Sequence, residues 1–220
     1  MFLQIDNVLT AAEVQSVTEL AERTRFINGG APNPHSSTKN NMIQDPRDPS
    51  GQRASQIVLA AIQRSEAARD FLWPNRIAVP LFLRYEPGMT YGARVDAAFM
   101  SVAAQALRAD VSCTVFLSDP ISYEGGELII HLGSETVRLK GSSGSAIFYP
   151  STALHEITPV ASGERLVMIT FIESQLPDAA QRELLYTLNE VRALEGLNMQ
   201  WRNRMSLEGV IANLLRMWVR

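Results

Sequence analysis

Six short runs rich in β-branched and aromatic residues follow one another in the central part of this 220-residue chain, separated by turn residues. The runs are RIAVPLFLRY, DVSCTVFLS, GELIIHL, ETVRLK, SAIFYP and RLVMITFIE. Helix-length amphipathic segments are largely missing between them. Parallel strands need such helical crossovers, so the pattern predicts an antiparallel barrel or jelly roll rather than a doubly wound sheet. Gly133-Ser134 fits a two-residue hairpin turn between two of the runs.

Helical patterns precede the predicted strands. Thr10 and Glu13 form a capping-box pattern, and apolar residues recur at helical spacing after them, which predicts a helix over residues 10–24. A second helix is predicted over residues 54–71. The stretch 28–52 is polar and rich in Pro, Asn, Ser and Gly, so we expect a long loop there.

Helical patterns return after the last predicted strand, within residues 177–220. These two amphipathic segments can pack on the strands or on a second copy of the chain, so a homodimer through them is one expectation. The predicted fold is mainly β with flanking α. It comprises an N-terminal helical segment over residues 1–75, a jelly-roll core over 76–176 and a C-terminal helical extension over 177–220.

Composition excludes some classes of partner. A formal net charge of -3 and a pI near 5.7 provide no general electrostatic attraction for nucleic acid or for an anionic membrane. The chain shows neither an export signal nor an apolar stretch of membrane-spanning length, so we expect a cytoplasmic protein whose partner is a small-molecule or peptide substrate. The single cysteine, Cys113, lies in the apolar run SCTVFL, which predicts a buried structural thiol.

Three chemically distinctive side chains stand beside the predicted strands. Asp96 follows one strand, His155 follows another, and Arg165 begins the last one. A carboxylate and an imidazole at the mouth of a barrel suit Fe(II), and a buried arginine offers a planar fork for a carboxylate. Each residue alone also has an ordinary explanation, as a turn cap, a core histidine or a structural ion pair.

The flanking sequence resembles a known enzyme family. LRYEPGMTYGARVDAAFM, VSCTVFLSDPISYEGGELII and GSAIFYPSTALHEITPVASGERLVMITF, with KNN at 39–41, resemble in order and spacing the PKHD-type hydroxylases. These belong to the prolyl 4-hydroxylase-like branch of the 2-oxoglutarate- and Fe(II)-dependent dioxygenases. The resemblance extends from about Phe26 to the C-terminus and implies a double-stranded β-helix fold. It also implies hydroxylation of an unidentified substrate, decarboxylation of 2-oxoglutarate to succinate, Fe(II) as the metal, and ascorbate as an accessory reductant.

The resemblance also implies roles for individual residues. Asp96 and His155 match two of the family's three iron ligands. Arg165 matches the basic residue that binds the C5 carboxylate of 2-oxoglutarate, and Tyr85 matches a tyrosine that hydrogen-bonds this co-substrate. Two further aromatic residues are expected in the pocket wall, Tyr91 and Phe116. Ordinary core packing explains Tyr85 and Tyr91 equally well.

The departure from the family pattern is Arg94, which stands at the position of the first histidine ligand. A guanidinium stays protonated and has no lone pair, so it cannot bind a metal; it would repel Fe(II) and can pair with Asp96 instead. Two hypotheses follow: a working dioxygenase, or a catalytically impaired or inactive member that keeps the barrel as a 2-oxoglutarate-binding or interaction module.

Three routes around the missing ligand are open. His131 or His35 can supply the nitrogen, although strand alternation favours an exposed or structural role for His131 and a surface role is expected for the loop residue His35. Alternatively, Asp96, His155, the co-substrate and water can hold iron weakly while Arg94 turns outward.

Overall fold

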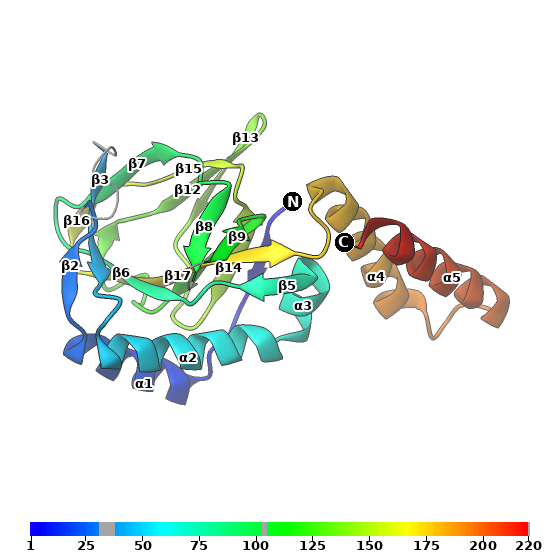
Figure 1. The fold of residues 1–220 in the computed structure, drawn as a ribbon, viewed down its shortest axis with the longest axis horizontal. Helices are drawn as coiled ribbons and strands as arrows, with labels where there is room; N and C mark the ends of the chain where they lie inside the picture. The colour runs from blue at the N-terminus through cyan, green and yellow to red at the C-terminus, as the bar shows by residue number, and fades with distance from the viewer. Residues whose placement is uncertain (31–37, 103–104, 220) are drawn as a thin grey trace.

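Two antiparallel sheets enclose the core of the protein (Figure 1). The computed structural model describes residues 1–30, 38–102 and 105–219. The larger sheet has the strand order β1 (Leu3–Ile5), β14 (Ala146–Pro150), β10 (Val111–Phe116), β17 (Arg165–Ser174), β6 (Leu81–Tyr85), β4 (Met42–Gln44) and β2 (Phe26–Asn28), with β5 (Pro74–Ile77) also paired to β17. The smaller sheet has the order β13 (Glu135–Leu139), β12 (Leu128–Leu132), β15 (Leu154–Ile157), β7 (Thr90–Arg94) and β3 (Lys39–Asn40).

Two further strand pairs complete the β structure: β8 (Phe99–Val102) with β9 (Gln105–Arg108), and β11 (Glu124–Gly125) with β16 (Val160–Ser162). The sequence pattern did not indicate the β8–β9 pair. The predicted jelly roll is confirmed. The turn at Gly133 is confirmed as well, because Leu132 pairs with Glu135 across a two-residue connection and Gly133 has the positive φ of 63° that such a turn needs.

The larger sheet is covered on both faces, which decides where its side chains point. Helices α1 (Ala11–Arg23) and α2 (Pro49–Arg64) lie together under its outer face (Figure 1), and Val17 and Val58 are fully buried there. Strand β10 buries all six of its residues. Because successive side chains point to opposite faces, Cys113 packs toward the helices, whereas its neighbours Ser112 and Thr114 point into the barrel. The buried Cys113 predicted from the sequence is confirmed, and burial raises the pKa of its thiol.

The helix predictions in the N-terminal half were partly right. The capping box at Thr10 and Glu13 is present at the start of α1. The second helix, predicted over residues 54–71, was wrong in its bounds. It begins at Pro49, where the Asp48 side chain caps the first turn, and a cap at Ser65 divides it from α3 (Glu66–Leu72).

The long loop predicted over residues 28–52 was also wrong, since β3, β4 and the first turn of α2 lie inside that stretch. These strands are short, and their pairing depends on distant partners: β3 pairs with β7, and β4 pairs with β6. Local sequence carries little signal for strands of two or three residues. Residues 31–37 of the predicted loop lie outside the described part of the chain.

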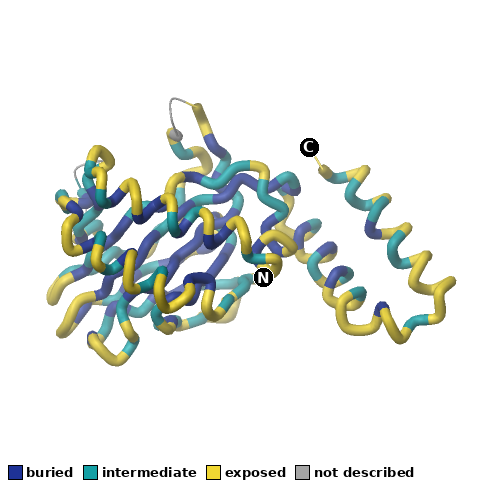
Figure 2. Tube along the Cα trace, turned by 90° about the horizontal axis from the view of Figure 1, so that it is seen from below, coloured by how far each residue is buried: buried dark blue, intermediate teal, exposed yellow. Residues whose placement is uncertain are grey.

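Helices α4 (Ala179–Glu195) and α5 (Trp201–Trp218) confirm the helical pattern predicted after residue 177. They form a hairpin that extends away from the barrel (Figure 1 and Figure 2). Their inner sides meet at Leu185 and Ile211, both buried, next to Leu176. In the described ranges, none of the helices combines the length and the apolarity that crossing a membrane requires.

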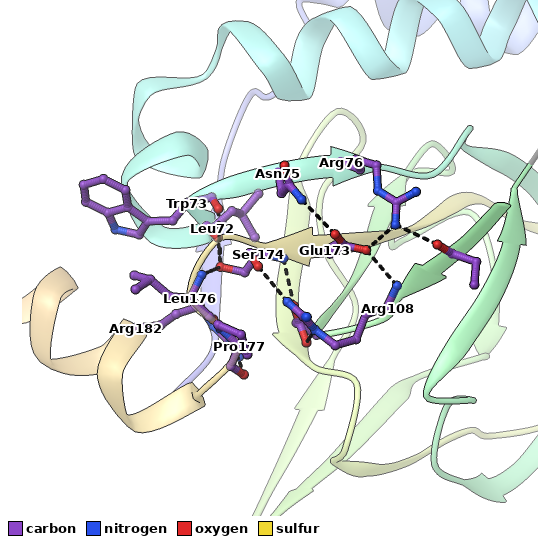
Figure 3. A network of polar contacts seen from close by, with 12 residues as sticks. Leu72, Trp73, Asn75, Arg76, Arg108, Glu173, Ser174, Leu176, Pro177 and Arg182 are labelled. Carbon is purple, nitrogen blue, oxygen red and sulfur yellow. Dashed lines mark hydrogen bonds and ion pairs between the residues drawn. The ribbon is translucent and has the colours of Figure 1, made fainter. Parts of the chain in front are cut away.

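A network of polar contacts joins this hairpin to the barrel at the end of β17 (Figure 3). The Ser174 hydroxyl donates to the Leu72 carbonyl of α3, and the Arg182 guanidinium of α4 donates to the Leu176 and Pro177 carbonyls. Glu173 accepts hydrogen bonds from the side chains of Asn75 and Arg76 and from the backbone N–H of Arg108. These contacts fix the end of β17 to α3, β5 and β9, and they hold the first turn of α4 against the segment that follows β17.

Candidate active site

A cavity of about 510 Å³ lies between the two sheets, within the usual size range of small-molecule sites. Strand alternation directs its main polar side chains inward: Arg165 of β17 pairs in register with Tyr85 of β6, and His155 of β15 pairs with Arg94 of β7. The chemically distinctive residues that line the cavity are Lys39, Tyr85, Tyr91, Arg94, Asp96, Ser112, Tyr149, His155 and Arg165. The structure thus brings together the residues that the sequence singled out, apart from Phe116.

Asp96 and His155 converge at one point in this cavity, where Asp96 Oδ2 lies 3.6 Å from His155 Nε2. The other ring nitrogen of His155, Nδ1, lies 2.9 Å from the Ala153 carbonyl oxygen, which can only accept a hydrogen bond. Nδ1 therefore carries the proton, and Nε2 has a free lone pair. Nε2 is buried and has no hydrogen-bond partner within the described chain. Burial lowers the pKa of His155, the Asp96 carboxylate opposes this, and the charge of Arg94 lowers the pKa further.

Two serines orient the Asp96 carboxylate. The Ser112 hydroxyl donates to Asp96 Oδ2 at 2.6 Å, and it lies 2.8 Å from the Ser151 hydroxyl. The backbone N–H of Asp96 also donates to the Ser151 carbonyl. These contacts hold the carboxylate next to His155. Neither serine was predicted from the sequence, since nothing in a strand such as DVSCTVFLS indicates which polar residue will meet a carboxylate from elsewhere in the chain.

Arg165 is a cation buried in the barrel. Its side chain is 1% exposed, and its Nε and Nη2 atoms have no hydrogen-bond partner within the described chain. The guanidinium lies 5.1 Å from the Tyr85 ring centroid and 5.9 Å from that of Phe116. Burial lowers the pKa of Arg165, yet a guanidinium remains charged in proteins. A buried cation with unused N–H donors is suited to an anionic ligand.

Phe116 does not line the cavity as expected. It lies against the Arg165 side chain and contributes to the hydrophobic core between the sheets. Tyr85, by contrast, does line the cavity, and its hydroxyl accepts a hydrogen bond from Asn41 Nδ2 at 2.9 Å. Burial raises the pKa of Tyr85, so the hydroxyl keeps a proton that it can donate into the cavity. The sequence indicated Asn41 only as part of the KNN motif. Its contact with Tyr85 depends on the pairing of β4 with β6.

Arg94 bends back over its own strand. Its guanidinium carbon lies 3.4 Å from the centroid of the Tyr91 ring, and Nη1 donates to the Tyr91 and Gly92 carbonyls. The pairing of Arg94 with Asp96 that the sequence left open is not formed between these described residues. Lys39 lies near the same ring, with Nζ 5.3 Å from the Tyr91 centroid. Burial, together with the charge of Arg94, lowers the pKa of Lys39.

The other histidines provide no third metal donor in the described structure. His131 of β12 is half-buried outside the cavity, where it contacts Thr136 and lies 4.0 Å from Glu156. Its place outside the cavity agrees with the exposed or structural role expected for it. His35 lies outside the described residues. Across the described ranges, no three histidine, cysteine or acidic residues gather closely enough to hold a metal. The cavity therefore matches a carboxylate ligand well, but within the described part of the chain its suitable donors for iron are Asp96 and His155.

Comparison with known proteins identifies the family. No protein-family model matches the chain. A PKHD-type hydroxylase from Sphingopyxis alaskensis is 47% identical over 208 residues, which covers 94% of each protein. Two solved structures share the fold at low identity. A Pseudomonas putida prolyl-4-hydroxylase has 20% identity and a TM-score of 0.56, covering 79% of this chain and 92% of that one. An oxidoreductase of the 2OG-Fe(II) oxygenase family from Burkholderia pseudomallei has 14% identity and a TM-score of 0.59, covering 78% and 85%. An identity of 47% with the Sphingopyxis relative over almost the full length of both proteins shows that the chain belongs to the PKHD-type hydroxylases.

Proposed function

We propose that this chain binds 2-oxoglutarate and Fe(II) in the cavity between its sheets and hydroxylates a substrate, with Arg94 reducing both its iron affinity and its turnover. One observation carries the proposal. The free lone pair of His155, the Asp96 carboxylate and the unpaired guanidinium of Arg165 all face the same cavity.

Arg165 and Tyr85 are the proposed 2-oxoglutarate ligands. The unused N–H donors of Arg165 bind one carboxylate of the co-substrate, and this anion neutralises a charge that is otherwise buried alone. The Tyr85 hydroxyl, held by Asn41, donates a further hydrogen bond. The two side chains come from paired strands, so the binding geometry is set by the sheet rather than by a mobile loop.

Asp96 and His155 are the proposed iron ligands. The hydrogen bond to Ala153 keeps His155 in the tautomer that presents its lone pair, and Ser112 fixes the carboxylate of Asp96. When bound, Fe(II) supplies the redox chemistry that couples 2-oxoglutarate decarboxylation to hydroxylation. Arg94 supplies a positive charge where the family has a third ligand. Its contacts with Tyr91 turn it away from Asp96, so it weakens the site without closing it.

The direct test compares the wild-type chain with Arg94→His. The variant is expected to bind Fe(II) more tightly and to form succinate faster, with an unchanged affinity for 2-oxoglutarate. Arg94→Met is the matched control, because it removes the charge without adding a metal ligand. If Fe(II) affinity and turnover rise in Arg94→His but not in Arg94→Met, the weak iron binding of the wild type is due to the missing ligand. Equal iron affinity and turnover in all three proteins would refute the role given to Arg94.

The charges of the cavity support a second candidate, a 2-oxoglutarate-binding module that needs no metal. Lys39, Arg94 and Arg165 carry three positive charges against one negative charge on Asp96, with His155 neutral, which leaves two positive charges. The dianion of 2-oxoglutarate balances these without iron. A calorimetric titration with 2-oxoglutarate, in EDTA and in Fe(II), distinguishes the two functions. Binding of 2-oxoglutarate that is equally tight in EDTA and in Fe(II) favours the module, and binding that requires Fe(II) excludes it.

A further inference from the structure

Exposed apolar side chains are concentrated on the C-terminal hairpin. Fifteen large hydrophobic residues are exposed in the described chain, and nine of them lie between residues 184 and 219. They include Leu184, 55% exposed, Leu194, 76% exposed, and Met217, 72% exposed. A concentration of this kind on an element that extends away from the barrel (Figure 2) is typical of an interaction surface.

The spacing of these residues matches the contact stripe of a helical bundle. On α4, exposed residues alternate at intervals of four and three, in the order Ala180, Leu184, Thr187, Val191 and Leu194. This is the a/d pattern with which one helix packs against another. Leu185 and the other buried residues of α4 lie on a different side of the helix, so the hairpin's own packing does not use this stripe. Val210 and Met217 on α5 are exposed and seven residues apart, and therefore share one heptad position.

The unpaired charges of the two helices have opposite signs. Within the hairpin, Arg192 of α4 pairs with Glu208 of α5 at 3.5 Å. The exposed Glu190 and Glu195 of α4 have no ion-pair partner in the described chain, and neither do three exposed arginines of α5. Those arginines are Arg202, Arg204 and Arg216. Each hairpin thus presents an acidic helix and a basic helix.

We propose that this surface binds a second copy of the same chain, forming a two-fold dimer in which α4 of each protomer packs against α5 of the other. A two-fold contact requires a self-complementary surface, and a hairpin with one acidic and one basic helix has this property. The hairpin face is about 25 Å long and about 20 Å wide, so the pair buries roughly 1,000 Å², the lower limit for a specific interface. The resulting four-helix bundle covers the stripe of Leu184, Val191 and Leu194.

Sedimentation velocity of the full-length chain at several concentrations tests the proposal. The wild type is expected to sediment as a dimer, and Val191→Glu is expected to raise the dissociation constant at least about 100-fold, because the change occurs twice in a two-fold interface. Ile121→Glu is the control, since Ile121 is 91% exposed on the barrel and should leave the dimer intact. A monomeric wild type, or a Val191→Glu protein that remains dimeric, overturns the proposal.

Charge-reversal variants test whether the partner that binds this surface is a second copy of the chain. One variant carries Glu190→Arg and Glu195→Arg, and the other carries Arg202→Glu and Arg216→Glu. Each alone is expected to be monomeric, because α4 and α5 then have charges of the same sign. An equimolar mixture is expected to form heterodimers, since both cross-contacts again join opposite charges. Circular dichroism melts show whether each variant is folded, and folded variants that fail to associate on mixing contradict the arrangement.

Discussion

Replacing Arg165 by methionine is expected to stabilise the ligand-free protein and to abolish its binding of 2-oxoglutarate. The two nitrogen atoms of Arg165 that are buried without partners, Nε and Nη2, cost about 1–3 kcal/mol each in the free energy of folding. Its cation–π contacts with the rings of Tyr85 and Phe116 recover about 0.5–2 kcal/mol each, and the long distances of 5.1 and 5.9 Å favour the lower part of this range. Methionine has a similar length and no charge to bury.

The net effect on the free energy of unfolding is a gain of about 1–3 kcal/mol, within the range found when buried charges are replaced by apolar residues. For a chain of this size, each kcal/mol raises Tm by about 2–4 °C. The same substitution removes the proposed charge-assisted contact with the co-substrate, so the 2-oxoglutarate dissociation constant should rise at least about 100-fold. Stability and ligand affinity are therefore expected to change in opposite directions.

The assay is thermal unfolding of wild type and Arg165→Met, with and without 2-oxoglutarate, supported by calorimetric titration. Excess ligand should raise the Tm of the wild type but not that of Arg165→Met. Arg84→Met is the matched control. Arg84 is on the same sheet but points outward, where it pairs with Glu164 at 3.3 Å and lies over the Phe26 ring. Its loss should reduce stability and leave ligand binding unchanged. An Arg165→Met protein that is destabilised, or that still binds 2-oxoglutarate tightly, would refute the reasoning.

Three further predictions concern individual contacts. Hydrogen bonding, chiefly from Arg76, lowers the pKa of Glu173 from 4.5 to about 2. Above pH 4.5 the ionised carboxylate therefore adds up to about 3 kcal/mol to the free energy of unfolding, and this contribution is lost as the pH falls toward 2. Urea unfolding of Glu173→Gln should show a stability deficit at pH 7 that shrinks over this range; a deficit independent of pH would contradict it. Ser112→Ala should weaken Fe(II) binding about 10-fold or more by freeing the Asp96 carboxylate, and an unchanged metal titration would exclude that role. Gly126→Ala should cost more stability than Gly88→Ala. Both glycines have positive φ, but an added methyl at Gly126 meets side chains at 3.0 Å, whereas at Gly88 it enters open space; chemical denaturation yielding equal losses would disprove this.

The sequence predicted elements whose signals are local. Alternating apolar runs and the glycine turn at Gly133 are sufficient to indicate an antiparallel sheet, and the capping box of Thr10 and Glu13 is sufficient to indicate where a helix begins. The short strands β3 and β4 were missed because they are stabilised by pairing with strands that lie far along the chain. The same limit applies to the site. Asp96 and His155 could be named as candidates, but Ser112, Ser151 and Asn41 acquire their roles only when distant strands place them beside those candidates.

The chemistry of each functional group is a property of the sequence alone. A protonated guanidinium has no lone pair to offer, so the sequence alone determines that Arg94 cannot be a metal ligand, whatever its surroundings. The direction of that side chain is a property of the tertiary structure, because it depends on the Tyr91 ring and on the carbonyls of β7 that accept its hydrogen bonds. Likewise, the sequence shows a charged residue at position 165. Only the packing of β17 against β6 decides that its guanidinium is buried without a partner and is available to a ligand.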